Sequence, residues 1–201
     1  MDQTSRVVDA DPFDPASDEH VALLTGMYVD YLVEEQERTG HMVPGFPVAG
    51  FLRTSIIRVG GQPAGFFSAD LKRYSIELIY VKPEYRRQGV ALVSLLHLAR
   101  SCPQRMDLKA PLTPGGQALA ERLHLGVAES TPEEIEGDAE AVRKAEREMR
   151  KRCRHKGARD PRRPCPRCYR AFLRKYAHQV VGGYAAGIRV MMQQAGRRAG
   201  A

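Results

Sequence analysis

The feature of the sequence with the clearest chemical use is a short basic turn between an apolar segment and a helix-like segment. Ser75 to Val81 is apolar and β-branched, residues 86–89 are Arg-Arg-Gln-Gly, and Gly89 to Ser101 is rich in apolar residues. The first backbone N–H groups of a helix are unpaired and partly positive, so such a junction can bind a pyrophosphate. Gly89 lets the backbone approach closely, and arginines supply charge for phosphate oxygens. The sequence therefore predicts an anion-binding loop at residues 86–91.

This segment also resembles a known family. Arg86-Arg87-Gln88-Gly89-Val90-Ala91 matches the pattern [Arg/Gln]-x-x-Gly-x-[Gly/Ala], and residues 81–86 are similar to Val-x-Pro-x-Tyr-Arg. Both patterns, with the order of predicted elements from Arg6 to about Leu125, resemble the acetyl-CoA-binding core of the GNAT N-acetyltransferase superfamily. The resemblance implies acetyl transfer from acetyl-CoA to an amine. An ordinary strand–turn–helix with a basic turn is the alternative.

The resemblance also assigns residues to acetyl-CoA. It implies that the strand-end residues pair through their backbone with the pantetheine arm, in a gap where two strands splay: Ile79, Tyr80 and Val81. It implies that the loop and the start of the following helix hold the pyrophosphate: Arg86, Arg87, Gln88, Gly89, Val90 and Ala91.

A direct attack of an amine on a thioester needs a base for the amine and an acid for the leaving thiolate. Glu77 is the only acidic residue of the predicted strand at 75–81, and in a regular strand it shares a face with Ile79 and Val81. Glu77 is therefore the predicted base. The alternative is an exposed residue, or a salt-bridge partner of Lys72 or Arg73.

The expected acid is missing from its usual place. The family carries a tyrosine on the last core helix, where this sequence has Leu119-Ala120-Glu121-Arg122-Leu123, with Ala120 at the tyrosine's position. Tyr85 and Tyr80 are the nearest substitutes; otherwise solvent protonates the thiolate, or the enzyme is slow or degenerate. The segment after this helix, 126–137, is mostly polar, so the core is either truncated or completed by the partner of a homodimer.

A second group of residues with ligand-type spacing lies near the C-terminus. Cys153, His155, Cys165 and Cys168 form a Cys-x-His…Cys-x-x-Cys set, and Cys102 is remote from it. Two ligand pairs on short knuckles suit tetrahedral zinc, and four protein ligands leave no open position, so the predicted site is structural. The intervening residues contain several prolines and little to bury, which favours a segment held by metal. Reduced cysteines without a metal are the alternative.

Charge divides the chain in two. Residues 1–142 contain 13 Lys+Arg against 21 Asp+Glu, whereas residues 143–201 contain 18 against 3, within a total of +7. The basic part could contact nucleic-acid phosphates, with Tyr169, Phe172 and Tyr176 stacking on bases. The alternatives are aromatic packing against the zinc knuckle and docking of the charges on the acidic half. A zinc-dependent nucleic-acid-binding or adaptor protein with a degenerate fold is thus the second functional hypothesis.

The predicted elements give an α+β fold. We expect strands at 6–8, 51–59, 64–69, 75–81 and 105–109, and helices at 17–38, 89–101 and 117–125. A charged helix then starts at Thr131, and a last helix spans 172–192 before a disordered tail. Residues 1–130 are predicted as a GNAT-like acyl-CoA-binding domain. Residues 131–201 are predicted as a basic helical region with a zinc module at about 150–180.

The sequence predicts a cytoplasmic protein, and the resemblance to the GNAT superfamily implies an amine-bearing small molecule or protein as its substrate. No apolar run reaches the ~18 residues of a membrane span, and the first residues are polar, which is unlike a secretory signal. We therefore expect no contact with a membrane.

Overall fold

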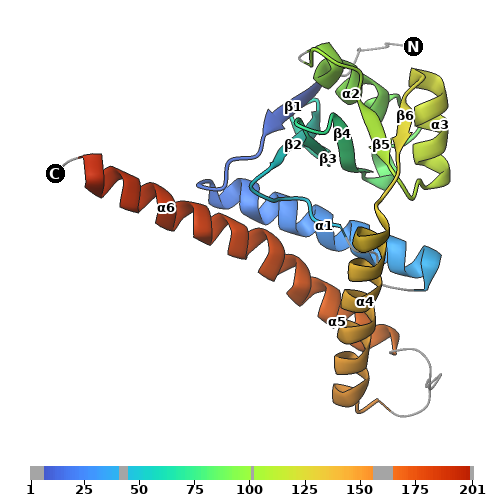
Figure 1. The fold of residues 1–201 in the computed structure, drawn as a ribbon, viewed down its shortest axis with the longest axis vertical. Coiled ribbons are helices and arrows are strands. Elements are labelled where there is room, and N and C mark those ends of the chain that lie inside the picture. Colours follow the sequence, from blue (N-terminus) through green and yellow to red (C-terminus); the bar gives the residue numbers. More distant parts are fainter. Residues whose placement is uncertain (1–6, 41–44, 101, 156–164, 200–201) are drawn as a thin grey trace.

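A mixed six-stranded sheet forms the centre of the protein (Figure 1). The computed structural model describes residues 7–40, 45–100, 102–155 and 165–199. The strands lie side by side in chain order: β1 (Val8–Pro12), β2 (Leu52–Val59), β3 (Gln62–Asp70), β4 (Ser75–Val81), β5 (Asp107–Lys109) and β6 (Gly126–Ala128). Neighbours from β1 to β4 are antiparallel, whereas β4, β5 and β6 are parallel. The predicted α+β class is confirmed.

Helices cover both faces of the sheet. The helical elements are α1 (Asp18–Thr39), η1 (Pro83–Tyr85), α2 (Val90–Arg100), α3 (Pro114–Leu123), α4 (Pro132–Arg152), α5 (Pro166–Ala177), the π-helical turn η2 (His178–Gly182) and α6 (Gly183–Ala199). On one face, α1 packs its Leu24, Tyr28 and Leu32 against Phe66 and Tyr80 of the sheet. On the other face, buried residues of α2 and α3 pack on the sheet.

Local sequence signals explain where these elements begin and end. The side chain of Ser17 accepts a hydrogen bond from the backbone N–H of His20, which caps α1. Thr131 and Glu134 form a reciprocal capping box at the start of α4. Gly60 and Gly61 join β2 to β3 with φ values of 57° and 79°, which a two-residue hairpin turn requires.

The C-terminal helices share a core with the sheet. Tyr169, Leu173, Ala177 and Val181 are buried in the same cluster as Tyr28 of α1. The two oppositely charged parts of the chain therefore also share apolar surface. Their packing is possible because the apolar residues of α5 recur at helical spacing among its charged residues and form a continuous apolar stripe. The division of the chain into domains at residues 1–130 and 131–201 stays a prediction, but the shared core leads us to expect that the two parts unfold together.

Some element boundaries differ from the prediction. The first strand extends to Pro12 instead of ending at Val8, and β6 forms within the polar segment that followed α3. The last helical segment starts at Pro166 rather than Phe172, because Cys165 caps it and proline suits the first helical position. Helix α6 continues to Ala199, so the disordered tail expected from Gln194 is wrong over that range. Residue Arg6 and the proline-containing segment 156–164 lie outside the described residues.

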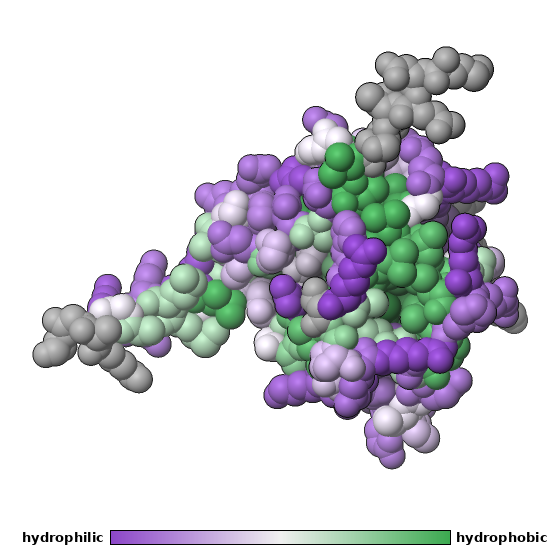
Figure 2. Space-filling model, turned by 90° about the horizontal axis from the view of Figure 1, so that it is seen from above, coloured by the Kyte–Doolittle hydropathy of each residue, from purple (hydrophilic) through white to green (hydrophobic). Residues whose placement is uncertain are grey.

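Helices α5, η2 and α6 form one rod that crosses beneath α1, and the end of α6 projects from the body (Figure 1). Seen from above, this projecting end carries exposed apolar surface, to which Val190, Met191 and Met192 contribute (Figure 2). Among the helices that the structure describes, none has both the length and the apolar character needed to cross a bilayer.

Candidate active site and candidate metal centre

Strands β4 and β5 meet only at their starts. Ser75 pairs with Asp107 and Ile76 pairs with Leu108, and β4 then continues to Val81 while β5 ends at Lys109. Within the described residues, the edge of β4 from Glu77 to Val81 has no strand partner on its β5 side. Its backbone groups can therefore pair with an extended ligand. The predicted pantetheine-binding residues Ile79 and Val81 lie on this edge.

The predicted phosphate loop follows directly. After η1, residues 86–89 form a turn in which Arg87 and Gly89 have left-handed φ values of 59° and 76°. A Cβ built on Gly89 would have nothing within 4 Å, so open space lies beside this backbone. All four turn residues are exposed, and α2 starts at Val90. Turns of this kind aim backbone N–H groups into a concavity that suits an anion.

Arg86 lies differently from the expected phosphate ligand. Its guanidinium donates two hydrogen bonds to Glu34 of α1, at 2.7 and 2.5 Å, and a third to the Val81 carbonyl at 2.8 Å. The same group lies 5.7 Å from the centre of the Tyr80 ring. Arg86 thus connects the loop to α1 and to the end of β4. Among the described residues, the exposed side chain of Arg87 makes no comparable hydrogen bond or ion pair.

Glu77 sits at a β-bulge. Ser68 pairs with Leu78 and Ala69 with Ile76, which leaves Glu77 as the extra residue of β4. The regular strand assumed for its orientation is therefore absent at this position. Ile79 and Val81 pack against the core under α2 and α3, whereas the Glu77 carboxylate contacts Lys109 and Ser75.

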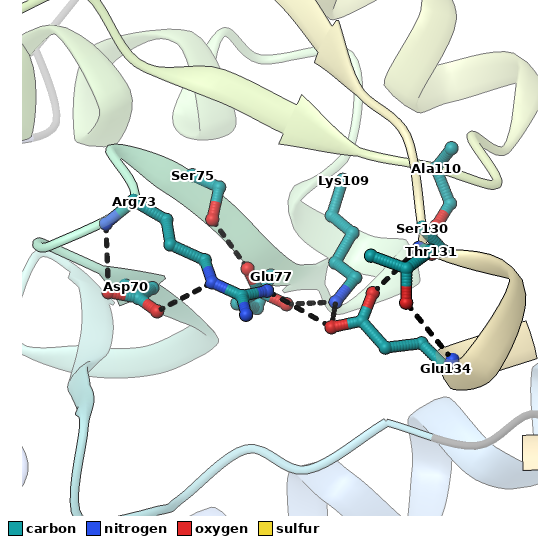
Figure 3. Close-up of polar contacts among 9 residues, drawn as sticks. All are labelled: Asp70, Arg73, Ser75, Glu77, Lys109, Ala110, Ser130, Thr131 and Glu134. Carbon is teal, nitrogen blue, oxygen red and sulfur yellow. Dashed lines mark hydrogen bonds and ion pairs between the residues drawn. The ribbon is translucent and has the colours of Figure 1, made fainter. Parts of the chain in front are cut away.

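The contacts of Glu77 belong to a charged network at the point where β4 and β5 separate (Figure 3). Lys109 Nζ lies 3.2 Å from Glu77 Oε2 and 3.5 Å from Glu134 Oε1. The Ser75 hydroxyl donates to Glu77 Oε1 at 2.5 Å. The sequence alternative named Lys72 or Arg73 as the ion-pair partner, and the structure corrects this to Lys109. Lys109 was missed because it lies on a different strand, and only the parallel pairing of β5 brings it here.

The start of α4 completes this network. Arg73 Nη1 lies 3.0 Å from Glu134 Oε1, and Arg73 also approaches Asp70 at 4.0 Å. Glu134 is fixed by its capping-box bond to the Thr131 backbone N–H, at 3.0 Å. The helix that follows β6 is therefore anchored at the predicted catalytic carboxylate. No sequence signal other than the capping box pointed to Glu134.

The two tyrosines considered as acids lie on opposite faces of the sheet. Tyr80 is buried against α1, and its pKa is raised to about 12, first by burial and then by the nearby carboxylates of Asp30 and Glu34. Tyr80 therefore stays protonated near neutral pH. Tyr85 is partly buried against the core under α2 and α3. Ala120 is buried in that same core.

Four predicted ligands converge at the junction of α4 and α5. The donor atoms of Cys153, His155, Cys165 and Cys168 all lie within 4.8 Å of one another. His155 Nδ1 is 3.8 Å from the Cys153 sulfur, 3.3 Å from the Cys165 sulfur and 3.4 Å from the Cys168 sulfur. The sulfurs of Cys153 and Cys165 are 3.4 Å apart.

These distances fit a four-coordinate ion. Zn–S bonds of ~2.3 Å and Zn–N bonds of ~2.0 Å in a tetrahedron put ligand atoms ~3.3 to 3.8 Å apart. Three thiolate donors and one imidazole are a common set for structural zinc. Cys165 also caps α5 by accepting the backbone N–H of Cys168, so the ligands and the helix start form one unit. Cys102 contacts Met106 at 3.6 Å and lies outside the cluster.

The aromatic residues of α5 pack against other parts of the protein. Tyr169 is 1% exposed and its hydroxyl donates to Glu146, at 3.0 Å. Phe172 stacks on Tyr176, and Tyr176 packs against Tyr28. The interpretation of Tyr169 as a base-stacking group is therefore wrong, because its ring is buried. For Phe172 and Tyr176, which are partly exposed, base stacking stays a prediction. Of the basic groups, Arg170 pairs with Glu37 at 2.6 Å, which confirms that some of the charge docks on the acidic half.

Comparison with solved structures finds chains of similar arrangement at low sequence identity. A possible acetyltransferase from Clostridium difficile 630 matches with a TM-score of 0.45 and 12% identity, over 62% of this chain and 94% of that one. An acetyltransferase from Thermus thermophilus matches at 0.43 and 15%, over 58% and 85%. A ribosomal-protein-alanine N-acetyltransferase from Brucella melitensis biovar Abortus 2308 matches at 0.40 and 18%, over 62% and 96%.

The comparison with protein families is more direct. No curated protein sequence matches the chain. The sequence of residues 27–124 matches the acetyltransferase (GNAT) family, and this range contains most of α1, strands β2 to β5, the 86–91 loop and helices α2 and α3. Residues 27–124 of the chain therefore belong to the acetyltransferase (GNAT) family.

Proposed function

We propose that the protein transfers an acetyl group from acetyl-CoA to the amine of a small molecule or protein. The observation that carries this proposal is the unpaired edge of β4, which leads directly into the 86–89 turn and the start of α2. A ligand with an extended arm and a pyrophosphate needs these two features next to each other: backbone groups for the arm and unpaired N–H groups for the phosphates.

Specific residues then hold each part of acetyl-CoA. The backbone of Ile79, Tyr80 and Val81 binds the pantetheine arm. The backbone of Gln88, Gly89, Val90 and Ala91 holds the pyrophosphate, and the side chain of Arg87 adds positive charge. Arg86 braces the turn through Glu34, so its contribution to phosphate binding is mainly to keep the loop in shape.

Residues beside the β4–β5 gap carry out the acid–base chemistry. The thioester supplies an activated acetyl group, and the attacking amine must lose a proton. Glu77 accepts this proton, directly or through one water molecule, while Lys109 and Ser75 hold its carboxylate in place. Tyr85 or the buried, protonated Tyr80 donates a proton to the leaving thiolate. Glu77 then holds one proton more and the tyrosine one fewer than before. Proton exchange with water restores both groups and returns the enzyme to its starting state.

The Cys/His cluster is proposed as a structural zinc site. All four positions are filled by protein donors, so the ion would hold the chain rather than activate water. It would tie the end of α4 to the start of α5, and α5 in turn packs on α1. Nucleic-acid binding and homodimer formation stay predictions, the former supported only by the basic charge of residues 143–201.

A substitution in the phosphate loop tests the proposal. Gly89→Glu places a carboxylate where the pyrophosphate would bind, so calorimetry should detect acetyl-CoA binding to the natural protein and none to the variant. Gly61→Glu is the matched control, because Gly61 has a similar φ of 79° and equally open space but lies in the β2–β3 turn. Equal acetyl-CoA affinity in both variants would contradict the assignment.

A further inference from the structure

A cavity of about 650 Å³ lies on the α1 side of the predicted active site. Three parts of the chain form its walls: the middle of α1, the end of β4 with the loop after it, and α5. The loop and α5 are far apart in sequence, and α5 is the helix whose first turn carries the predicted metal ligands. Such a cavity exists only because the C-terminal helices fold back on the acetyltransferase domain.

Two ion pairs link these walls. Arg86 of the loop binds Glu34 of α1 at 2.7 and 2.5 Å, and Arg170 of α5 binds Glu37 of α1 at 2.6 Å. These four charges satisfy one another. They hold the loop and α5 against the same side of α1.

Four further charged residues line the cavity without an ion pair among the described residues. Asp30 and Glu84 supply carboxylates, and Lys82 and Arg174 supply cations. Val29 and Val33 add apolar surface to the lining. A ligand with a single kind of charge would satisfy only half of this set, whereas a ligand with both an ammonium group and an anionic group can pair with all of it.

The cavity also adjoins the residues proposed to bind acetyl-CoA. Lys82 and Glu84 immediately precede the phosphate loop, and Tyr80, which lines the cavity, lies between the two residues whose backbone is proposed to bind pantetheine. An amine held here would lie beside the part of β4 proposed to bind the pantetheine arm, on the opposite side of β4 from α2.

We infer that this cavity binds the acceptor, and that the acceptor is an amine that also carries a carboxylate or phosphate group. The inference rests on the proposed acetyl transfer. Asp30 and Glu84 bind the ammonium group before it is deprotonated, and Lys82 and Arg174 bind the anionic group. The substrate class is therefore a zwitterionic amine rather than a polycation or an uncharged chain with one amine.

A panel of four amines tests the inference. The probes are 4-aminobutyrate and O-phosphoethanolamine, which carry both charges, butylamine, which lacks the anionic group, and spermidine, which is a polycation. Acetyl-CoA-dependent release of free thiol gives kcat/KM for each, and calorimetry gives binding of each probe to the protein without acetyl-CoA. We expect the two zwitterionic probes to have kcat/KM values at least about tenfold above the other two, since a charge-assisted contact is worth about that factor.

Variants separate the cavity from the acetyl-CoA site. Arg174→Gln should raise KM for the zwitterionic probes by about tenfold while leaving butylamine and the Kd of acetyl-CoA unchanged. Lys175→Gln, on the exposed neighbouring position of α5, is the matched control and should change nothing. Preference for spermidine or butylamine, or equal effects of the two variants, would overturn the inference. So would the absence of calorimetric binding of both zwitterionic probes.

The outcomes distinguish this inference from the proposed function. If the protein binds acetyl-CoA but neither binds nor acetylates the zwitterionic probes, the proposed function stands and the inference about the cavity is refuted. If the protein does not bind acetyl-CoA, the proposed function is refuted. Calorimetric binding of the four probes then still tests the cavity.

Discussion

Glu77 Oε2 lies 3.2 Å from Lys109 Nζ, across the point where β4 and β5 separate. The pair is possible because a bulge at Glu77 changes the direction of its side chain, and because β5 ends at Lys109. Both side chains are mostly buried, at 16% and 24% exposure. The carboxylate proposed as the base is therefore held in one position by a cation from the facing strand, at the closed end of the gap proposed for the thioester.

Replacing Glu77 tests its role as the base. Glu77→Gln keeps the size of the side chain and its contact with Ser75 but removes the basic carboxylate. We expect kcat to fall by about 10²-fold, since general base catalysis contributes about that much or more, while the Kd of acetyl-CoA stays the same. Steady-state kinetics with an acceptor that is turned over, and calorimetry with acetyl-CoA, measure the two quantities.

Glu140→Gln is a suitable control for this experiment, because Glu140 is an exposed carboxylate on α4. This variant should have the same kcat and the same affinity for acetyl-CoA as the natural protein. Natural turnover and an unchanged pH profile in Glu77→Gln would eliminate Glu77 as the base.

Much of the acetyltransferase domain was predictable because its signals are local. The cap at Ser17, the Gly60-Gly61 turn and the capping box at Thr131 each fix an element boundary through contacts within a few residues. β6 was missed because its three residues carry no alternating pattern, and only pairing with β5 makes them a strand. Short strands of this kind are defined by tertiary contacts rather than by propensity.

The candidate site was predictable in part for the same reason. The 86–91 loop and the Cys/His cluster are contiguous or nearly so, and spacing alone identifies them. The partners Lys109 and Glu34 were missed, because they come from other elements and depend on the sheet pairing and on the position of α1. The bulge at Glu77 was also missed, since an insertion in a strand is set by the register of its neighbour.

A core substitution tests whether the C-terminal helices and the sheet unfold together. Leu173 of α5 is fully buried with residues of α1, so Leu173→Ala should lower the free energy of unfolding by about 2–5 kcal/mol. Because the core is shared, we expect one transition that moves as a whole when followed by circular dichroism in urea. Met191→Ala, at a position that is 57% exposed on α6, should change stability by less than about 0.5 kcal/mol. A separate, unshifted transition for the remainder of the chain would instead show independent domains.

Alkaline pH should destabilise the protein because of its buried tyrosines. Burial raises the pKa values of Tyr28 and Tyr31 and, with nearby carboxylates, raises that of Tyr80 to about 12. In the unfolded chain a tyrosine ionises near pH ~10. Above that pH the unfolded state loses protons that the folded state keeps, so the free energy of unfolding falls as pH rises.

Thermal unfolding at a series of pH values measures this effect. The melting temperature should be insensitive to these tyrosines below pH ~10 and should fall above it. Tyr80→Phe should reduce the steepness of the fall, whereas Tyr74→Phe, at a partly exposed turn position, should leave it unchanged. Equal slopes in Tyr80→Phe and the natural protein would contradict the assigned cause.

The metal site gives the last prediction. We expect about one zinc ion per chain by elemental analysis of untagged protein, because the four donors have the number, type and spacing of a closed tetrahedral site. Cys165→Ser should lose the metal, since the Cys165 sulfur lies 3.4 Å from the Cys153 sulfur and 3.3 Å from His155 Nδ1, and also caps α5. Cys102→Ser should retain it.

Removal of the metal should act locally. Chelation takes away the tie between α4 and α5, whereas Leu173, Ala177 and Val181 keep their contacts with α1. In limited trypsin digestion we therefore expect new cleavage at the arginines flanking the ligands, such as Arg154 and Arg167, and continued protection of the sheet. A metal-free natural protein that resists trypsin equally with and without chelator would show that hydrophobic packing alone holds this junction. If Cys102→Ser loses the metal while Cys165→Ser keeps it, the ligands are assigned to the wrong cysteines.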